Sequence, residues 1–507
     1  MGSTKRTWLW IGFGFFLLCA AYAATRLVHL TTLPIFTDEA IYIRWSQIGM
    51  RDPNWRFISL VDGKQPMFTW VMMVLLKIGK HFDPLFIGRL TSVLSGFGTM
   101  LGVWFLSREL FRDRRVPWVA SVLYLFIPFT LWYDRMALYD SMVSMFSVWS
   151  LFFAVLMAKR LRLDTALLLG LVLGAGMLNK TSAFLSLYFL PVTLLVFDWQ
   201  KKDRLRRLGV WILLAVFATG LSQLLYGILR LSPFYHMIAE KDNVFVFSIR
   251  EWLNEPFRFF AGNLRGMFDW LRSYLTFPIF VAVVWPLFAR FRHDRERWLL
   301  YLWWALPFGA LAAFAKILYP RFILFMSIPL LVVASESIIH LWDGLKLPIL
   351  RIALVILLAA PSLYVSYFIV LHPVSAPIPV SDRSQYIDDW PAGGGVPQVI
   401  AFLTKQVAAQ KIHVFTEGTF GLMPYSIEIY LVENPNITIK GVWPLPETMP
   451  LDMRTDAASA PTYFIMNQTQ VAPPSWPLTL IGQYQKGDNT DQKLRLYRVN
   501  APKPAKL

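Results

Sequence analysis

The sequence predicts a polytopic α-helical membrane protein with about eleven transmembrane helices and a C-terminal α/β domain outside the membrane. Three observations predict this fold class. The 507 residues are 56% hydrophobic and only 16% charged, with a mean hydropathy of +0.47. Apolar runs of about spanning length recur to about residue 372. The remainder of the chain alternates helical and strand patterns instead, as a small folded domain does.

The apolar runs are separated by short polar segments, and most are long enough to cross a bilayer as a helix. They cover residues 8–30, 86–107, 116–133, 141–158, 165–178, 182–197, 208–229, 272–290, 297–315, 321–342 and 347–371. The apolar stretch at 66–79 has roughly fourteen residues, which is too short to span. It ends in basic residues, so we expect a helix that lies on the membrane surface.

The net charge of +17 reflects basic residues that gather in alternate loops. Because Lys and Arg accumulate on the cytoplasmic side, this pattern predicts a plasma-membrane protein with its N-terminus inside and its C-terminal domain outside. It indicates a bilayer partner and no nucleic acid. The basic loops contain Lys5, Arg6, Arg108, Arg112, Arg114, Arg115, Lys159, Arg160, Arg162, Lys201, Lys202, Arg204, Arg206, Arg207, Arg290, Arg292, Arg295, Arg297 and Lys346.

Two regions follow from this topology. Residues 1–372 form the transmembrane domain, with outer loops at 31–85 and 231–272, and residues 373–507 form the extracytoplasmic α/β domain. The second outer loop alternates aromatic and basic residues, which suits a helix resting on the headgroup layer. After a linker rich in Pro and Gly, the pattern predicts helices at 399–409 and 420–431 and strands at 411–416, 436–442, 462–466 and 493–499.

The strongest chemical signal is an acidic pair, Asp38 and Glu39, a few residues after the first apolar run. The pair would supply a general base, with Asp38 the candidate, or hold a divalent cation against a phosphate. The structural alternative is that Thr37 caps a helix whose first turn contains both carboxylates, where the helix dipole favours them.

A second outer turn contains three charges, Asp134, Arg135 and Asp140, between two apolar runs. Charges near a bilayer are costly, and three charges in so short a turn therefore indicate a function. The alternative is that Asp134 or Asp140 neutralises Arg135, or that Asp140 caps the helix that begins there.

Four more cations lie on the outer side, at Lys64, Lys180, Lys316 and Arg321. Their position opposes the inside-positive bias and places them beside the outer carboxylates. This arrangement favours recognition of an anionic headgroup such as a phosphate. The alternative is snorkelling to the outer headgroups, chiefly for Lys316.

Taken in order, these motifs resemble the GT-C superfamily of membrane glycosyltransferases. The closest resemblance is to the dolichyl-phosphate-mannose protein mannosyltransferases and the bacterial lipid A aminoarabinose transferases. The resemblance covers roughly the first 330 residues. The matching segments are Asp38-Glu39, Lys64-Gln65-Pro66-Met67-Phe68-Thr69-Trp70, Gly88-Arg89-Leu90-Thr91-Ser92, Asp134-Arg135-Met136-Ala137-Leu138-Tyr139-Asp140, Asn179-Lys180 and Pro320-Arg321-Phe322.

The resemblance implies an inverting transfer of mannose or a similar hexose or pentose, from a polyprenyl-phosphate donor to a lipid, glycan or protein acceptor on the outer face. The candidate catalytic residues are Asp38, Glu39 and Asp140, and those for the donor phosphate are Lys64, Arg135, Lys180 and Arg321. A Mg, Mn or Zn ion is the candidate cofactor, at Asp38 and Glu39. Some relatives carry a metal-binding carboxylate where this chain has Gly63.

Two other classes of function fit a polytopic chain. A transporter or lipid flippase would place ionisable residues near mid-span and show paired, interrupted helices, whereas these charges gather at the outer ends. A membrane sensor or assembly factor would bind its ligand through the α/β domain and would not need Asp38 or Arg135. The sequence does not specify the sugar or the acceptor.

Overall fold

The computed structural model describes residues 2–288 and 294–501. The predicted inner-loop cations Arg290 and Arg292 lie outside the described residues. Within the described part, each predicted apolar run coincides with helical structure. The elements are α1 (Gly2–Leu27), α4 (Pro84–Leu110), α5 (Val116–Phe126), α6 (Pro128–Asp134), α7 (Tyr139–Arg160), α8 (Leu163–Asn179), η3 (Thr181–Ala183), α9 (Phe184–Tyr188), η4 (Leu190–Val196), α10 (Arg204–Tyr226), η5 (Gly227–Leu231), α13 (Phe260–Leu275), α14 (Phe277–Val284), η6 (Trp285–Leu287), α15 (Asp294–Phe314), η7 (Pro320–Ile323), α16 (Leu324–Gly344) and α17 (Pro348–Leu371).

Five helical segments among the described residues are long and apolar enough to cross a membrane. They contain α4, α7, α10, α16 and α17. Two bent pairs raise the number to seven if each pair is one span: α5 with α6, bent by 60°, and α13 with α14 and η6, bent by 113°. The predicted runs at 165–178 and 182–197 form shorter apolar helices, and α15 has charges in its first turn. In the run at 8–30, residues 11–27 are an apolar part of α1.

The two loops predicted to lie outside, 31–85 and 231–272, contain short helices, namely α2 (Thr37–Arg51), η1 (Pro53–Trp55), η2 (Ile58–Asp62), α3 (Met67–Ile78), α11 (Met237–Phe245) and α12 (Ile249–Asn254). The single helix expected along 231–272 is wrong. The chain there breaks into α11, α12 and most of α13, and α13 continues past the predicted start of the next span. That span is bent where Thr276 adopts a φ of +62°. Pro278 lies in the first turn of α14, where its missing N–H has no intrahelical partner to lose, so a new helix can start directly after Thr276.

The C-terminal part forms an α/β unit around a five-stranded sheet of order β2-β1-β3-β5-β4. β1 pairs in parallel with β2 and β3, whereas β5 is antiparallel to β3 and β4. The sequence patterns missed β4 and α21. The elements are α18 (Val380–Arg383), η9 (Ser384–Asp388), α19 (Val396–Ala409), β1 (Ile412–Glu417), α20 (Leu422–Leu431), β2 (Ile437–Val442), α21 (Leu451–Ser459), β3 (Thr462–Met466), β4 (Leu478–Lys486) and β5 (Asn489–Val499).

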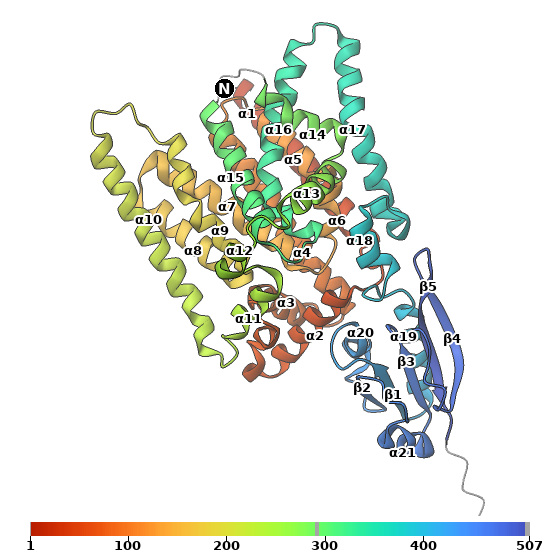
Figure 1. Ribbon diagram of the computed structural model, residues 1–507. Coiled ribbons are helices and arrows are strands. Elements are labelled where there is room, and N and C mark those ends of the chain that lie inside the picture. The colour runs from red at the N-terminus through yellow and green to blue at the C-terminus, as the bar shows by residue number, and fades with distance from the viewer. Residues whose placement is uncertain (1, 289–293, 502–507) are drawn as a thin grey trace, which may run out of the picture.

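The α/β unit packs against α2 at the end of the helical bundle opposite the amino terminus (Figure 1). The Arg44 guanidinium lies 2.5 Å from the Glu428 carboxylate of α20, and the Gln47 amide donates to the Ile429 carbonyl over 2.9 Å. One cluster of buried apolar side chains runs from the bundle into the sheet. The unit therefore contacts the same short helix that begins with the acidic pair.

Candidate active site

The acidic pair lies in the first turn of α2. Phe36 is the N-cap residue, and its amide N–H donates to the Glu39 carboxylate over 2.9 Å. Thr37 is therefore not the cap. Its hydroxyl donates instead to the carbonyl of Pro391 over 2.8 Å. The two carboxylates differ in environment, because the Glu39 side chain is fully buried and that of Asp38 is 24% exposed.

Glu39 faces away from the surface on which Asp38 lies. Both of its oxygens accept from the guanidinium of Arg89 at 2.8 Å, and one also accepts from the backbone N–H of Ala137 at 2.7 Å. A carboxylate held by so many donors is neither a base nor a free metal ligand. The assignment of Glu39 as catalytic is therefore corrected: it fixes α2 to α4 and to the turn before α7.

Asp38 forms an ion pair with Arg321. Its carboxylate lies 3.1 Å from the Arg321 guanidinium, which is 9% exposed. Arg321 sits in η7, just before α16, and Pro320 before it fixes the backbone at the first helical position. The guanidinium is surrounded by aromatic rings, with its carbon 5.0 Å from the ring of Tyr319 and 5.8 Å from that of Phe322.

A second ion pair, between Lys180 and Asp140, lies beside the same aromatic ring, that of Phe322. The Lys180 ammonium is 2.7 Å from the Asp140 carboxylate and 4.6 Å from the centre of the Phe322 ring. Lys180 follows the end of α8, and Asp140 is in the first turn of α7. The structure thus brings together Asp38, Asp140, Lys180 and Arg321, which lie far apart in the sequence.

Lys64 and Lys241 complete the cluster of cations. Their ammonium groups lie 5.6 and 6.0 Å from the ring of Phe245, which is 5.9 Å from that of Phe322. Lys241 also pairs with Asp62 at 2.7 Å. The pKa of Lys64 is lowered to about 8: burial lowers it most, the Asp38 carboxylate raises it, and the nearby cations Lys180, Lys241 and Arg321 lower it.

Sequence reasoning missed Lys241 and its aromatic neighbour Phe245, because residues 231–272 read as a helix on the headgroup layer. The signal that was available is a run of charge, Glu240-Lys241-Asp242, inside an otherwise aromatic loop. α11 lies directly against the turn before Lys64, where a Cβ on Gly63 would come within 2.4 Å of the Met237 carbonyl.

The structure contradicts the assignment of Arg135 to the donor phosphate. Its guanidinium donates to four backbone carbonyls, two in the last turn of α1 and two just after it, at distances of 2.8 to 3.1 Å. Its side chain is buried there. Asp134 pairs with Arg26 at 3.4 Å, so the predicted alternative of an Asp134–Arg135 pair is wrong as well. The carbonyls come from Thr25, Arg26, Val28 and His29.

Lys316 stays outside the cluster. Its ammonium lies 3.0 Å from the Glu251 carboxylate and ties α12 to the end of α15. A divalent cation also does not fit the acidic pair, because Glu39 is fully engaged with Arg89 and Asp38 faces a guanidinium. Among the described residues no group of three or more His, Cys, Asp or Glu side chains is arranged to hold a metal ion.

Comparisons with known proteins bear on the family and the fold of the chain. Residues 63–226 match the profile of the dolichyl-phosphate-mannose-protein mannosyltransferase family. This segment includes Lys64, Asp140 and Lys180, whereas Asp38 and Arg321 lie outside it. No curated protein sequence matches the chain.

Solved structures share the fold over nearly the whole chain. ArnT from Cupriavidus metallidurans in the apo state is 13% identical with a TM-score of 0.60, and the match covers 99% of this chain and 100% of that one. ArnT bound to undecaprenyl phosphate is 13% identical with a TM-score of 0.59, covering 97% and 99%. The oligosaccharyltransferase AglB from Archaeoglobus fulgidus, in complex with an inhibitory peptide and a dolichol-phosphate, is 12% identical with a TM-score of 0.51, covering 90% and 70%. The chain therefore has the fold of ArnT, and the expected resemblance to the GT-C superfamily of membrane glycosyltransferases is confirmed.

Proposed function

We propose that this protein is a membrane glycosyltransferase that transfers a sugar from a polyprenyl-phosphate donor to an acceptor hydroxyl. The observation that carries the proposal is the 3.1 Å ion pair of Asp38 with Arg321 inside a cluster of four cations. A carboxylate next to a phosphate-binding cluster is what such a transfer needs. The family match and the polyprenyl phosphates in the structures of ArnT and AglB support this donor class.

The chemistry is a single displacement at the anomeric carbon, which inverts its configuration. The acceptor hydroxyl gives its proton to Asp38 as its oxygen forms the new bond to that carbon. The bond between the anomeric carbon and the phosphate oxygen breaks, and the polyprenyl phosphate leaves with both electrons. The charge that develops on the phosphate is stabilised by Arg321, Lys64, Lys180 and Lys241, which are already in place before reaction.

Asp140 holds Lys180 within this cluster through the 2.7 Å ion pair, so its part in the reaction is to position a phosphate ligand. The proposed sugar is mannose or a similar hexose or pentose, and the proposed acceptor is a lipid, glycan or protein hydroxyl. No metal enters the proposed mechanism, because the carboxylates at Asp38 and Glu39 are occupied by Arg321 and Arg89.

The proposed location is the plasma membrane, with about eleven spans, the N-terminus inside, and residues 373–507 as an extracytoplasmic domain. The α/β unit lies at the end of the bundle opposite the amino terminus (Figure 1). Asp140 of the site is in the first turn of α7, whereas the basic residues Lys159 and Arg160 are in its last turn, at the other end of that helix. This separation of the site from the basic loops supports a site on the outer face.

The test is a transfer assay in detergent with radiolabelled polyprenyl-phosphate mannose and other polyprenyl-phosphate sugars, and a membrane extract as acceptor. We expect donor consumption by the wild type and its loss in Asp38→Asn. Asp491→Asn, an exposed carboxylate on β5, is the matched control and keeps full activity. If the wild type leaves every donor intact, the transferase proposal fails and a transporter or flippase becomes the better reading. Equal rates for Asp38→Asn and the wild type would reject Asp38 as the base.

A further inference from the structure

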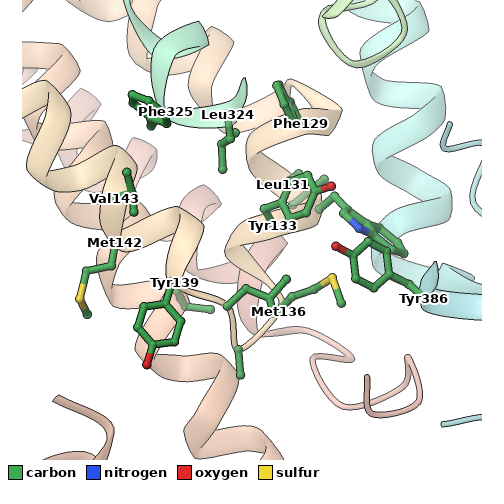
Figure 2. Packing of buried hydrophobic residues seen from close by; sticks show 14 of the residues in the cluster. Phe129, Leu131, Tyr133, Met136, Tyr139, Met142, Val143, Leu324, Phe325 and Tyr386 are labelled. Carbon is green, nitrogen blue, oxygen red and sulfur yellow. The ribbon is translucent and has the colours of Figure 1, made fainter. Parts of the chain in front are cut away.

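The linker that joins α17 to the α/β unit is folded into the helical bundle beside the site. Asp382, in α18, is fully buried and its carboxylate accepts from the hydroxyls of Tyr133 and Tyr274. These tyrosines belong to α6 and α13, so this contact fastens the linker to two separate parts of the bundle. The buried packing around Tyr133, with Tyr386 of the linker beside it, is seen in Figure 2.

A second contact reaches the acidic turn itself. The carbonyl of Pro391 accepts from both the backbone N–H of Thr37, at 3.0 Å, and its hydroxyl, at 2.8 Å. The next residue, Ala392, forms an antiparallel bridge with Phe36, the N-cap of α2. The start of α2, directly before Asp38, is thus held by the backbone of the linker at residues 391–392.

Between these two contacts lies Tyr386, whose side chain is fully buried. Its ring packs edge-on against the ring of Phe36, with the centroids 4.7 Å apart. Its hydroxyl oxygen accepts from the Arg321 guanidinium over 3.4 Å, while another nitrogen of the same guanidinium lies 3.1 Å from Asp38. Arg321 is therefore held on one side by Asp38 and on the other by the linker.

We propose that Tyr386 is a positioning residue of the transferase site. It holds the Arg321 guanidinium in place beside Asp38, and residues 380–392 complete the site. The inference rests on the proposed function. A guanidinium that ends a long, flexible side chain has several rotamers, and only a fixed one stabilises a leaving phosphate without reorganisation. The hydroxyl of Tyr386 removes that freedom, and burial raises the pKa of Tyr386, so the group stays protonated and holds Arg321 by a hydrogen bond rather than as a charged partner.

The first test separates positioning from folding. Tyr386→Phe keeps the ring against Phe36 and removes only the hydroxyl. We expect kcat to fall about tenfold, the size of a lost hydrogen bond to a charged group, with KM for the donor within about twofold. Tyr463→Phe is the matched control and keeps the wild-type kcat, because it removes only a hydroxyl of β3 that donates to Gln406 of α19.

The double variant decides whether Tyr386 acts through Arg321. In an Arg321→Gln background, Tyr386→Phe is expected to lower kcat by less than about twofold, because the group that it positions is gone. A tenfold loss of kcat in both backgrounds would overturn the proposal, since the hydroxyl would then stabilise the fold without acting through Arg321. An unchanged kcat in the single variant would overturn it as well.

Hydrogen–deuterium exchange tests the same contact without any substrate. In Tyr386→Phe we expect faster exchange of the amides in residues 36–41 and 320–326, with no such change in Tyr463→Phe. Unchanged exchange in both segments would reject the positioning role. If exchange rises as expected while the wild type consumes no donor, the positioning of Arg321 stands and the proposed function fails.

Discussion

Glu39 and Arg89 form a fully buried, two-point ion pair in which both carboxylate oxygens lie 2.8 Å from guanidinium nitrogens. The same guanidinium also donates to the carbonyls of Leu30 and Leu33, in the chain between α1 and α2. Arg89 thus sets the path of the segment that delivers Asp38 to the site. The neighbouring carboxylates of one dipeptide have separate tasks, one in the fold and one facing the cations.

Glu39→Gln tests this division of tasks. The variant leaves the charge of Arg89 buried without its partner, which is expected to cost about 3–5 kcal/mol of the free energy of unfolding. Thermal unfolding in detergent measures the loss, and Asp38→Asn is the comparison: Asp38 is 24% exposed, whereas Glu39 and Arg89 are fully buried, so this variant is expected to lower the melting temperature less than Glu39→Gln and to abolish turnover. A Glu39→Gln protein as stable as the wild type would contradict the structural role.

Arg135→Gln tests the reassignment of Arg135. We expect a lower melting temperature, because the carbonyls at the end of α1 lose the charged donor that satisfies them. The KM for a polyprenyl-phosphate donor should stay within about twofold of the wild type. Lys180→Gln is the matched comparison from the cation cluster and should raise that KM at least tenfold. A similar rise in Arg135→Gln would return Arg135 to the phosphate site.

Chelation tests the metal that the resemblance implied. Because Arg89 engages both oxygens of Glu39 and Arg321 faces Asp38, we expect incubation with EDTA to leave the transfer rate unchanged. The measurement is the initial rate after dialysis against the chelator, followed by addition of Mg, Mn or Zn. A loss that one of these ions restores would contradict the arrangement seen around Asp38.

The sequence was informative about the site where charges interrupt apolar runs. Asp38, Asp140, Lys180 and Arg321 stand out because each lies near the predicted outer end of an apolar run, and the structure brings them together. Glu39 and Arg135 stand out equally, yet their side chains point into the fold. Sequence spacing does not distinguish these directions, since one residue along a helical turn rotates a side chain by about 100°.

The missed features share a different cause. Lys241 and Tyr386 reach the site only because the second outer loop and the C-terminal linker fold back over the bundle, and no local pattern encodes such tertiary contacts. β4 escaped prediction because most of its residues are at least partly exposed at the edge of the sheet, so hydrophobic alternation is weak there. The 113° bend between α13 and α14 lies inside a run that reads as one continuous apolar segment.

The contact between α2 and α20 predicts that the α/β unit influences turnover. Arg44→Gln removes the 2.5 Å ion pair with Glu428 and is expected to lower kcat several-fold, since the same helix, α2, carries Asp38 in its first turn. Glu428→Gln should have the same effect, and the double variant should be no worse than either single one, because all three lose one interaction. Additive losses in the double variant would show that the two residues act separately.

Lys64 predicts a pH dependence of donor binding. Its pKa in the free protein is about 8, lowered mainly by burial, so the ammonium is charged below this pH and neutral above it. A neutral amine does not attract the donor phosphate, and kcat/KM should therefore fall as the pH rises through about 8. Bound phosphate favours the charged form and raises the pKa of Lys64, so the corresponding fall in kcat should occur at a higher pH. In Lys64→Gln the fall in kcat/KM near pH 8 should disappear, and kcat/KM should be lower than that of the wild type at every pH below about 8. A fall that persists in this variant would assign it to another group of the cluster.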